Sequence, residues 1–465
     1  MAKLTFYGAT ETVTGSRFLL EIKDLKLLID CGLFQGSKEN RLRNWEPFPV
    51  PPSELNAVLL THAHIDHIGY LPRLCKDGFT GPIICTHPTA DLSKILLKDS
   101  AHLQEEDAEW ANKKGYSKHD PALPLFTVDD AEACMGQFSS FHYGDEIFLN
   151  GDIRIKFRDS GHILGSSFID IKVSHGDQDS RKILFTGDLG RPSRDILREP
   201  VQVYNIDYLI IESTYGDRLH GDALFYDELA RIIKESVERH GVLIIPSFAV
   251  GRTQTLLYVI RELEEQGKIP ILPVYVDSPM ALEATGIYEK QIPNQNLRSR
   301  VLTIMGEKIF RTADTRLCES KKKSQAINDI KSNAIIISSS GMVTGGRILH
   351  HLEQRLPNAN DTVLFVGYQA EGTRGSTILS GAPTVKIHGN LVPINAKIEN
   401  ITGLSSHADY NESLAWLMGL NRGPKKIFVV HGEKESRKSF AQKIASRYEW
   451  DVAIPSFQES YILDL

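Results

Sequence analysis

The chain has few cysteines, no long hydrophobic run and no large excess of charge of either sign. Its 465 residues include five cysteines, an odd number, and no two of them are spaced as CxxC or CxxxC. This argues against a disulfide framework and a cysteine zinc knuckle, so we expect reduced core cysteines. No window approaches the roughly 18 consecutive apolar residues of a membrane span, and the N-terminal sequence lacks an apolar signal core. We therefore expect a cytoplasmic protein without a membrane partner.

The nearly balanced charge and the lack of phosphate-binding motifs argue against further classes of protein. The 53 Lys and Arg against 59 Asp and Glu give a formal net charge of −6. Bulk charge therefore gives no argument for a nucleic-acid partner, although a local basic groove is compatible with this balance. The sequence also lacks GK[ST] and a GxGxxG after a strand, so it carries no nucleotide-binding fingerprint. The chemistry is expected to come from the 16 histidines.

Alternating apolar runs and helical patterns indicate an α/β protein. Runs such as LKLLID, AVLLTH and KILFTGD predict strands, and helical spacing at 90–112 and 129–138 predicts an excursion from this β core. After Glu212, repeated strand–loop–helix units predict a parallel sheet flanked by helices. The first pattern resumes near Ile394. Because no linker or low-complexity tract separates these parts, we expect an inserted domain.

The strongest signal is THAHIDH, residues 61–67, between an apolar strand and a helical segment. His62 and His64 share a face in an extended segment, and the turn into the helix can bring Asp66 and His67 to the same cavity. Imidazole and carboxylate are ligands that zinc takes, so the segment can serve two metal ions. A surface His-rich turn is the simpler alternative, but three histidines and an aspartate so close together disfavour it.

Other acidic residues and histidines follow the ends of apolar strands. Ligands bind at the carboxyl ends of strands in α/β sheets, so these residues are expected to converge on THAHIDH. Any one of them alone is more often a cap or turn residue. Five together, beside a metal motif, favour a site; they are Asp30, His162, Asp188, Glu212 and His431.

The motifs, in this order, resemble a known family. HxHxDH, GHILGS and FTGD are similar to the metallo-β-lactamase fold, and ESTYG, PSFAVGRTQ, SSSGMVTGGR, SSHADY and VVHGE are similar to its β-CASP branch of RNA and DNA nucleases. The resemblance covers essentially the whole chain. It implies an α/β fold in which an αββα sandwich carries an inserted β-CASP domain. The implied bounds are 1–211 and 394–465 for the two parts of the metallo-β-lactamase domain and 212–393 for the β-CASP domain.

The resemblance also implies a centre with two Zn²⁺ ions per chain. The first ion would be held by His62, His64 and His162. The second would be held by Asp66, His67 and His431. Asp188 would bridge both ions. Asp30 would not bind an ion itself, but would accept an imidazole N–H and so orient a histidine ligand. The catalytic residues would be His407, which pairs with Glu212 as the general acid, together with Glu212 and Asp66.

The inserted region carries glycine-rich loops and isolated arginines. Backbone N–H groups at helix N-termini and guanidinium groups suit phosphate oxygens, although tight turns are the simpler explanation. With the resemblance, we expect substrate contacts at Arg252, Gly341, Arg347 and Arg374. The role of His388, which ends a strand, stays open.

We therefore predict a zinc-dependent ribonuclease that acts on single-stranded RNA in RNA processing or decay. A two-metal mechanism would leave 5′-phosphate and 3′-hydroxyl ends, by endonuclease or 5′-exonuclease action or both. The alternatives are a DNA-directed nuclease of the family, a hydrolase of a small thioester or lactam, and a non-catalytic scaffold. The long insertion argues against a small substrate, and the filled ligand positions argue against a scaffold. A homodimer stays open.

Overall fold

The structure is a computed structural model of the chain. It describes residues 1–115, 117, 119–176, 179–192, 196–220, 225–291, 309–367, 369–370, 372–401 and 403–465. Contacts within the chain divide it into two units, Met1–Leu219 with Ser406–Leu465, and His220–Ser405. The domain bounds expected from the sequence, at 211/212 and 393/394, stay a prediction.

Two seven-stranded sheets form the first unit. The first sheet has the order β22-β1-β2-β3-β4-β5-β6 and is parallel from β3 to β6. Its strands are β1 (Ala2–Phe6), β2 (Phe18–Ile22), β3 (Leu25–Ile29), β4 (Ala57–Leu59), β5 (Ile83–Thr86), β6 (Phe138–Phe141) and β22 (Ser460–Leu463). The second sheet has the order β21-β20-β11-β10-β9-β8-β7 and is parallel from β10 to β21. Its strands are β7 (Ile147–Phe148), β8 (Ile153–Asp159), β9 (Ser167–Ser174), β10 (Ser180–Phe185), β11 (Tyr208–Glu212), β20 (Lys426–Val430) and β21 (Val452–Ala453).

The main core of this unit lies between the two sheets. Leu4 and Phe6 of β1 share one buried cluster with Phe157 of β8 and Phe428 of β20. Successive side chains of a strand point to opposite faces, so Phe168 of β9 lies in a second cluster, with residues of α13 and α14. The apolar alternation of the strands thus supplies both a central core and an outer one.

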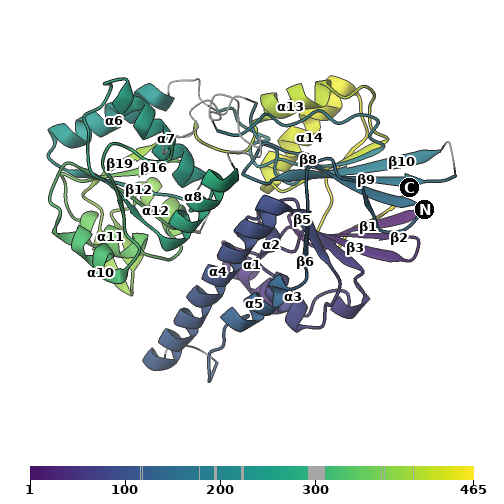
Figure 1. The fold of residues 1–465 in the computed structure, drawn as a ribbon, viewed down its shortest axis with the longest axis horizontal. Helices are drawn as coiled ribbons and strands as arrows, with labels where there is room; N and C mark the ends of the chain where they lie inside the picture. The colour runs from purple at the N-terminus through teal and green to yellow at the C-terminus, as the bar shows by residue number, and fades with distance from the viewer. Residues whose placement is uncertain are drawn as a thin grey trace. The chain divides into compact units, whose positions relative to one another are not determined.

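Helices cover the outer face of each sheet, as Figure 1 shows. On the second sheet these are α13 (Tyr410–Met418) and α14 (Lys434–Tyr448). The helices α2 (Ile65–Ile68), α3 (Leu71–Lys76), α4 (His87–Lys114) and α5 (Val128–Met135) accompany the first sheet, and a short α1 (Lys38–Leu42) precedes β4. The αββα sandwich expected from the sequence is confirmed. The helix expected at 129–138 ends earlier, because Gly136 is its C-cap and Phe138 begins β6.

The second unit contains a parallel sheet flanked by helices, as expected. Its order is β14-β13-β15-β12-β16-β19, and every pairing is parallel. The strands are β12 (Val242–Pro246), β13 (Val274–Asp277), β14 (Thr315–Leu317), β15 (Ala334–Ser338), β16 (Thr362–Phe365) and β19 (Lys397–Asn400), beside a hairpin of β17 (Thr384–Ile387) and β18 (Asn390–Pro393). The helices are α6 (Phe225–Glu238), α7 (Arg252–Glu265), α8 (Pro279–Gln291), α10 (Lys321–Ala326), α11 (Ile348–Arg355) and α12 (Arg374–Leu379).

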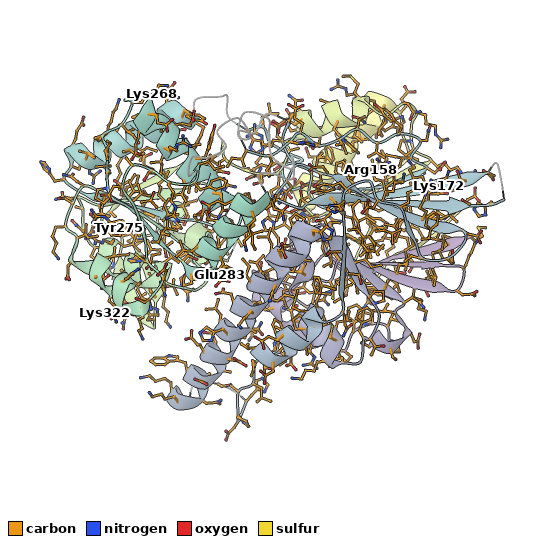
Figure 2. The ribbon with its side chains drawn as sticks, in the orientation of Figure 1. Arg158, Lys172, Lys268, Tyr275, Glu283 and Lys322 are labelled. Atoms are coloured by element: carbon orange, nitrogen blue, oxygen red, sulfur yellow. The ribbon has the colours of Figure 1, made fainter. Side chains whose placement is uncertain are left out.

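In the second unit, apolar side chains pack in the core and charged side chains lie on the surface. Tyr275 of β13 packs against the apolar core, whereas Lys268 and Lys322 are exposed on the outside of the unit (Figure 2). Within the described ranges, every helix is too short or too polar to cross a membrane.

Candidate metal centre

The ends of strands in the first unit bring the predicted ligands together. Asp30 follows β3, His162 lies between β8 and β9, Asp188 follows β10, and His431 follows β20. Asp30 and His431 have φ angles of 57° and 49°, in the left-handed region that non-glycine residues rarely adopt. Such backbone strain concentrates at functional sites.

Gly187 of the FTGD motif explains how Asp188 reaches the centre. Its φ angle is 50°, and a Cβ atom at this position would lie 2.5 Å from the Cβ of Thr61. Only glycine therefore lets the loop after β10 approach the THAHIDH segment this closely. The motif is a packing requirement that places a carboxylate beside the histidines.

One set of ligand atoms comes from His62, His64, His162 and Asp188, which lie within 4.8 Å of one another. His64 Nδ1 is 3.0 Å from His62 Nε2 and 3.2 Å from His162 Nε2. Asp188 Oδ2 is 3.3 Å from both Nε2 atoms. Three imidazole nitrogens and one carboxylate oxygen thus face a common point.

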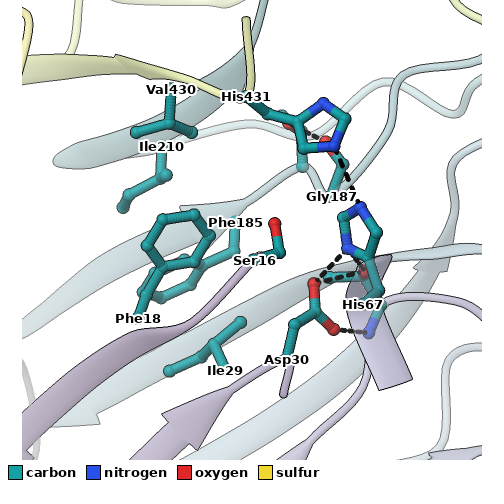
Figure 3. Close-up of a pocket in the computed structure, with 12 residues that line it drawn as sticks. Ser16, Phe18, Ile29, Asp30, His67, Phe185, Gly187, Ile210, Val430 and His431 are labelled. Carbon is teal, nitrogen blue, oxygen red and sulfur yellow. Dashed lines mark hydrogen bonds and ion pairs between the residues drawn. The ribbon is translucent and has the colours of Figure 1, made fainter. Parts of the chain in front are cut away.

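A second set lies beside it and comes from Asp66, His67 and His431. His431 Nε2 is 3.2 Å from His67 Nε2 and 3.3 Å from Asp66 Oδ2. The other oxygen of Asp188, Oδ1, is 3.3 Å from His67 Nε2. Figure 3 shows the ring of His67 between Asp30 and His431. Asp188 therefore presents one oxygen to each set.

These distances fit a metal centre better than a hydrogen-bonded cluster. Bonds of about 2.0–2.1 Å to a tetrahedral zinc place neighbouring ligand atoms about 3.3 Å apart. Asp188 Oδ1 is buried and accepts no hydrogen bond from any described residue. His67 Nε2 and His431 Nε2 also lie 3.2 Å apart. If both rings are neutral, only one of these two nitrogen atoms can carry a proton and donate it to the other. A cation in each set would satisfy these atoms.

The electrostatics of the first set favour neutral imidazoles. Burial lowers the pKa of His62 to about 3 and that of His64 to about 4, and it lowers the pKa of His162 well below its ordinary value. Neutral imidazole is the form that binds a metal ion. The residues of the first set are therefore in their metal-binding protonation state at neutral pH.

The second set attracts positive charge. Burial lowers the pKa of His67, but the carboxylates of Asp188, Asp30 and Asp66 outweigh this effect and raise the pKa well above its ordinary value. Buried carboxylates need a compensating cation. A metal ion in the second set would supply that charge in place of the imidazolium proton.

Hydrogen bonds to the ring nitrogens that point away from the centre orient the histidine ligands. Asp30 Oδ2 is 2.7 Å from His67 Nδ1, which leaves Nε2 of that ring to face the centre. Thr61 donates its N–H and its hydroxyl to Asp30, both at 2.7 Å. The hydroxyl of Thr214 is 3.1 Å from His431 Nδ1 and orients that ring. Neither threonine is among the site residues expected from the sequence, although Thr61 belongs to THAHIDH and Thr214 to ESTYG.

His407 lies at the edge of the two sets and pairs with Glu212. Its Nδ1 is 2.9 Å from Glu212 Oε1 and 3.8 Å from Asp188 Oδ2, and its side chain is 19% exposed. Glu212 also accepts the N–H groups of Leu189 and Thr214, at 2.8 and 3.0 Å. Burial lowers the pKa of His407, but the charges of Glu212 and Asp188 outweigh it and raise this pKa to about 9. With this pKa the His407 ring is protonated on both nitrogens at neutral pH.

The four expected substrate contacts lie in the second unit. Arg252 is buried and donates to the Val366 carbonyl. Arg347 donates to Asp277 Oδ1 and to the Cys318 carbonyl, both at 2.7 Å.

The other two expected contacts also take part in loop packing. Arg374 donates to the carbonyls of Lys386, Val343 and Thr344, at 2.9, 3.2 and 3.0 Å. A Cβ atom at Gly341 would lie 2.8 Å from the Phe248 ring. All three arginines thus hold neighbouring loops, and their contact with a substrate stays a prediction.

His388 lies in the turn between β17 and β18, in the second unit. Its Nδ1 is 3.0 Å from Glu353 Oε2, and its ring centroid is 4.6 Å from that of His350. The side chain is 36% exposed. A hydrogen bond to a surface carboxylate and the contact with the His350 ring account for the position of His388.

Fold and site together define a metal-dependent hydrolase of the metallo-β-lactamase type. Three family models match the chain: a metallo-beta-lactamase superfamily domain at residues 19–198, a Beta-Casp domain at 253–378, and a Zn-dependent metallo-hydrolase RNA specificity domain at 391–455. The chain belongs to the β-CASP branch of the metallo-β-lactamase family, as its motifs indicated.

Relatives with assigned names match over nearly the whole chain. Ribonuclease TTHA0252 of Thermus thermophilus is 34% identical, over 97% of this chain and 98% of its own length. An RNase J-like protein of Methanocaldococcus jannaschii is 32% identical, over 96% of each chain. Transcription termination factor FttA of the same organism is 31% identical, over 97% of this chain and 70% of its own length.

A solved structure of a protein of unknown function from Enterococcus faecalis V583 has the same fold. Its TM-score is 0.54 at 13% identity, and the match covers 99% of this chain and 100% of that one.

Proposed function

We propose that this chain is a two-zinc ribonuclease that hydrolyses phosphodiester bonds of single-stranded RNA in RNA processing or decay. The observation that carries the proposal is the position of Asp188, whose two oxygens face two separate sets of ligands. Relatives that match the chain over at least 96% of its length are named as ribonucleases or RNase J-like proteins. This supports RNA as the substrate class.

The ligand sets assign the residues that would hold each ion. His62, His64 and His162 would hold one zinc, Asp66, His67 and His431 the other, and Asp188 would bridge them. When bound, the zinc pair supplies an activated water nucleophile and a counter-charge for the phosphoryl oxygens. Asp30 and Thr214 fix the rings of His67 and His431, so that Nε2 of each ring faces the centre.

His407 would act as the general acid. Glu212 holds Nδ1 at 2.9 Å, so Nε2 is the nitrogen from which we infer proton transfer to the departing oxygen. Two backbone N–H groups fix Glu212 in turn, which keeps the His407 ring in one orientation. Asp66, whose side chain is 20% exposed, would accept the proton that the nucleophilic water releases.

This division of roles predicts the chemistry of the product ends. The attacking oxygen stays on phosphorus and His407 protonates the departing 3′ oxygen, so the products are a 5′-phosphate and a 3′-hydroxyl. The 2′-hydroxyl of the substrate takes no part in bond breaking. A nuclease that uses this hydroxyl as its nucleophile would instead leave a 2′,3′-cyclic phosphate.

The test is cleavage of a fluorescent single-stranded RNA, followed by mass spectrometry of both product ends. We expect 5′-phosphate and 3′-hydroxyl ends, loss of activity with a chelator and recovery with zinc. A substrate with one 2′-deoxyribose 5′ to the scissile bond is expected to be cleaved by the same chemistry.

Controls separate the proposal from its alternatives. Asp188→Asn, prepared in parallel, identifies any contaminating metal-free ribonuclease. A cyclic phosphate product, or a complete block by the single deoxyribose with binding intact, would overturn the mechanism. Faster turnover of the matched DNA, or of a thioester or lactam, would overturn the substrate class.

A further inference from the structure

Two of the five free cysteines lie in contact within the first unit. Cys75, in the last turn of α3, has its Sγ 3.2 Å from the Sγ of Cys134, near the end of α5. A disulfide has an S–S bond of about 2.05 Å, so closing this gap needs an approach of only about 1 Å. The pair belongs neither to the metal ligands nor to the residues that orient them.

The two helices hold the sulfurs together by contacts that do not involve sulfur. Lys76, next to Cys75, places its Nζ 2.8 Å from Asp130 Oδ2. Asp130 also belongs to the capping box that begins α5, in which it exchanges hydrogen bonds with Thr127. Asp130 and Cys134 are four residues apart and lie on one face of the helix. The ion pair and the thiol pair therefore join the same two helices.

The two thiols differ in access to solvent. Cys75 is partly exposed, whereas Cys134 is fully buried. The hydrogen bond with Cys75 and burial both raise the pKa of the Cys134 thiol. Cys31 and Cys85 are also fully buried, and burial raises the pKa of both thiols. An oxidant in solution would thus meet Cys75 first, with Cys134 directly behind it.

We propose that Cys75 and Cys134 are a site of oxidative modification, at which a small-molecule disulfide such as oxidised glutathione closes a reversible disulfide bond. The Cys75 thiolate attacks one sulfur of the small disulfide, forms a mixed disulfide and releases one small thiol. Cys134 then loses its proton and attacks Cys75 Sγ, which releases the second small thiol. The two cysteines lose two electrons and two protons, and the small disulfide gains them. A dithiol reductant reverses the reaction.

The disulfide would link α3 to α5, which are far apart in the sequence. The cross-link closes a loop of 134 − 75 = 59 residues, which restricts the unfolded chain far more than the folded one. The native contact already holds the two sulfur atoms 3.2 Å apart. Oxidation is therefore expected to raise the midpoint of thermal unfolding by several degrees, and a reductant to restore the original value.

The experiment treats the full chain with oxidised glutathione and then alkylates the remaining thiols under denaturing conditions. We expect five alkylated cysteines before treatment and 5 − 2 = 3 after it, with a mass that shows loss of two hydrogens and no bound glutathione. Peptide mapping without reductant should recover Cys75 joined to Cys134. Five alkylated thiols after treatment, or a bond between other cysteines, would overturn the proposal.

Variants test the order of attack. Cys134→Ser leaves Cys75 without a resolving partner, so the mixed disulfide with glutathione should persist on Cys75. Cys318→Ser is the matched control, because Cys318 is a buried free cysteine of the second unit, and it should still form the Cys75–Cys134 bond. Absence of glutathione from Cys75 in a folded Cys134→Ser chain would contradict the proposed first step. The wild-type peptide map decides the case if that variant does not fold.

Discussion

Replacement of Asp30 by asparagine tests whether this carboxylate orients His67 for metal binding. Asp30 is fully buried and takes part in three short contacts, with the N–H and hydroxyl of Thr61 and with His67 Nδ1, each at 2.7 Å. Asparagine has the same shape and tolerates the left-handed backbone at this position, so the fold should persist. Its amide has only one acceptor oxygen. With the N–H of Thr61 on that oxygen, the NH₂ group faces His67 Nδ1, and the ring must carry its proton on Nε2 instead.

The size of the expected loss in zinc affinity follows from the tautomer of His67. Its Nε2 faces His431 and Asp188, at 3.2 and 3.3 Å, so a proton there blocks one ligand of the second set. Loss of a partner behind a metal ligand typically costs about 10–100-fold in metal affinity. This corresponds to about 1.4–2.7 kcal/mol of binding free energy. We expect the larger loss in the second set, because Asp30 contacts His67 directly and reaches His62 of the first set only through the Thr61 hydroxyl, which is 3.1 Å from His62 Nδ1.

The assay is a zinc titration in competition with a chromophoric chelator, which resolves a weak site from a tight one. Asp207→Asn is the matched control. Asp207 is also a buried aspartate of the same unit, where it accepts the N–H of Lys182 at 2.8 Å and an Arg422 N–H at 2.9 Å, away from the ligands. It should bind zinc like the wild type. Two zinc ions bound with unchanged affinity by folded Asp30→Asn, or equal losses in both variants, would refute the reasoning.

Three further changes test other parts of the site. Asp188→Ala removes the carboxylate shared by both sets, so metal analysis should show both ions weakened and activity abolished; two retained ions would refute its bridging position. His407→Ala should retain both metals yet lose cleavage by about 10²-fold or more, and loss of a zinc would instead make His407 a ligand. Burial raises the pKa of Asp159 to about 7, so this carboxyl group destabilises the fold increasingly as the pH rises from about 4 to 7, where it ionises only in the unfolded chain. The lowered pKa values of His62, His64 and His162 act in the opposite direction, so the contribution of Asp159 is measured as the difference in pH slope between the wild type and Asp159→Asn. Asp159→Asn should remove this contribution and unfold at a higher temperature at pH 7; an unchanged slope in calorimetry would contradict the assignment.

The sequence predicts the parts of this protein that depend on local pattern. THAHIDH follows β4 and leads into α2, where the apolar run and the polar turn already indicated a strand followed by a helix. His162, Asp188, Glu212 and His431 converge because they follow β8, β10, β11 and β20, which run in one direction and end at one edge of the second sheet. Asp30 joins them from the end of β3 in the first sheet. His407 and Glu212 are 195 residues apart, and only their motifs linked them before the structure placed them 2.9 Å from each other.

Contacts between distant segments are what the sequence could not supply. Thr214 and His431 are 217 residues apart, and nothing in either motif specifies that the hydroxyl orients the ring. The division of the Asp188 oxygens depends on how the loop after β10 approaches THAHIDH, which Gly187 permits. Likewise, composition predicted reduced core cysteines, but only the packing of α3 on α5 brings Cys75 and Cys134 to 3.2 Å.

The arginines of the inserted region show why a motif alone does not determine a contact. A guanidinium group has five N–H donors, which suit phosphate oxygens and backbone carbonyls equally well. In SSSGMVTGGR the loop turns back on itself, and Arg347 uses donors on Asp277 and a carbonyl that are already within 2.7 Å. Arg374 spans three carbonyls in the same way. A phosphate would have to compete with acceptors that the fold holds in place, so removal of either side chain should disturb the loops before it disturbs any contact with RNA.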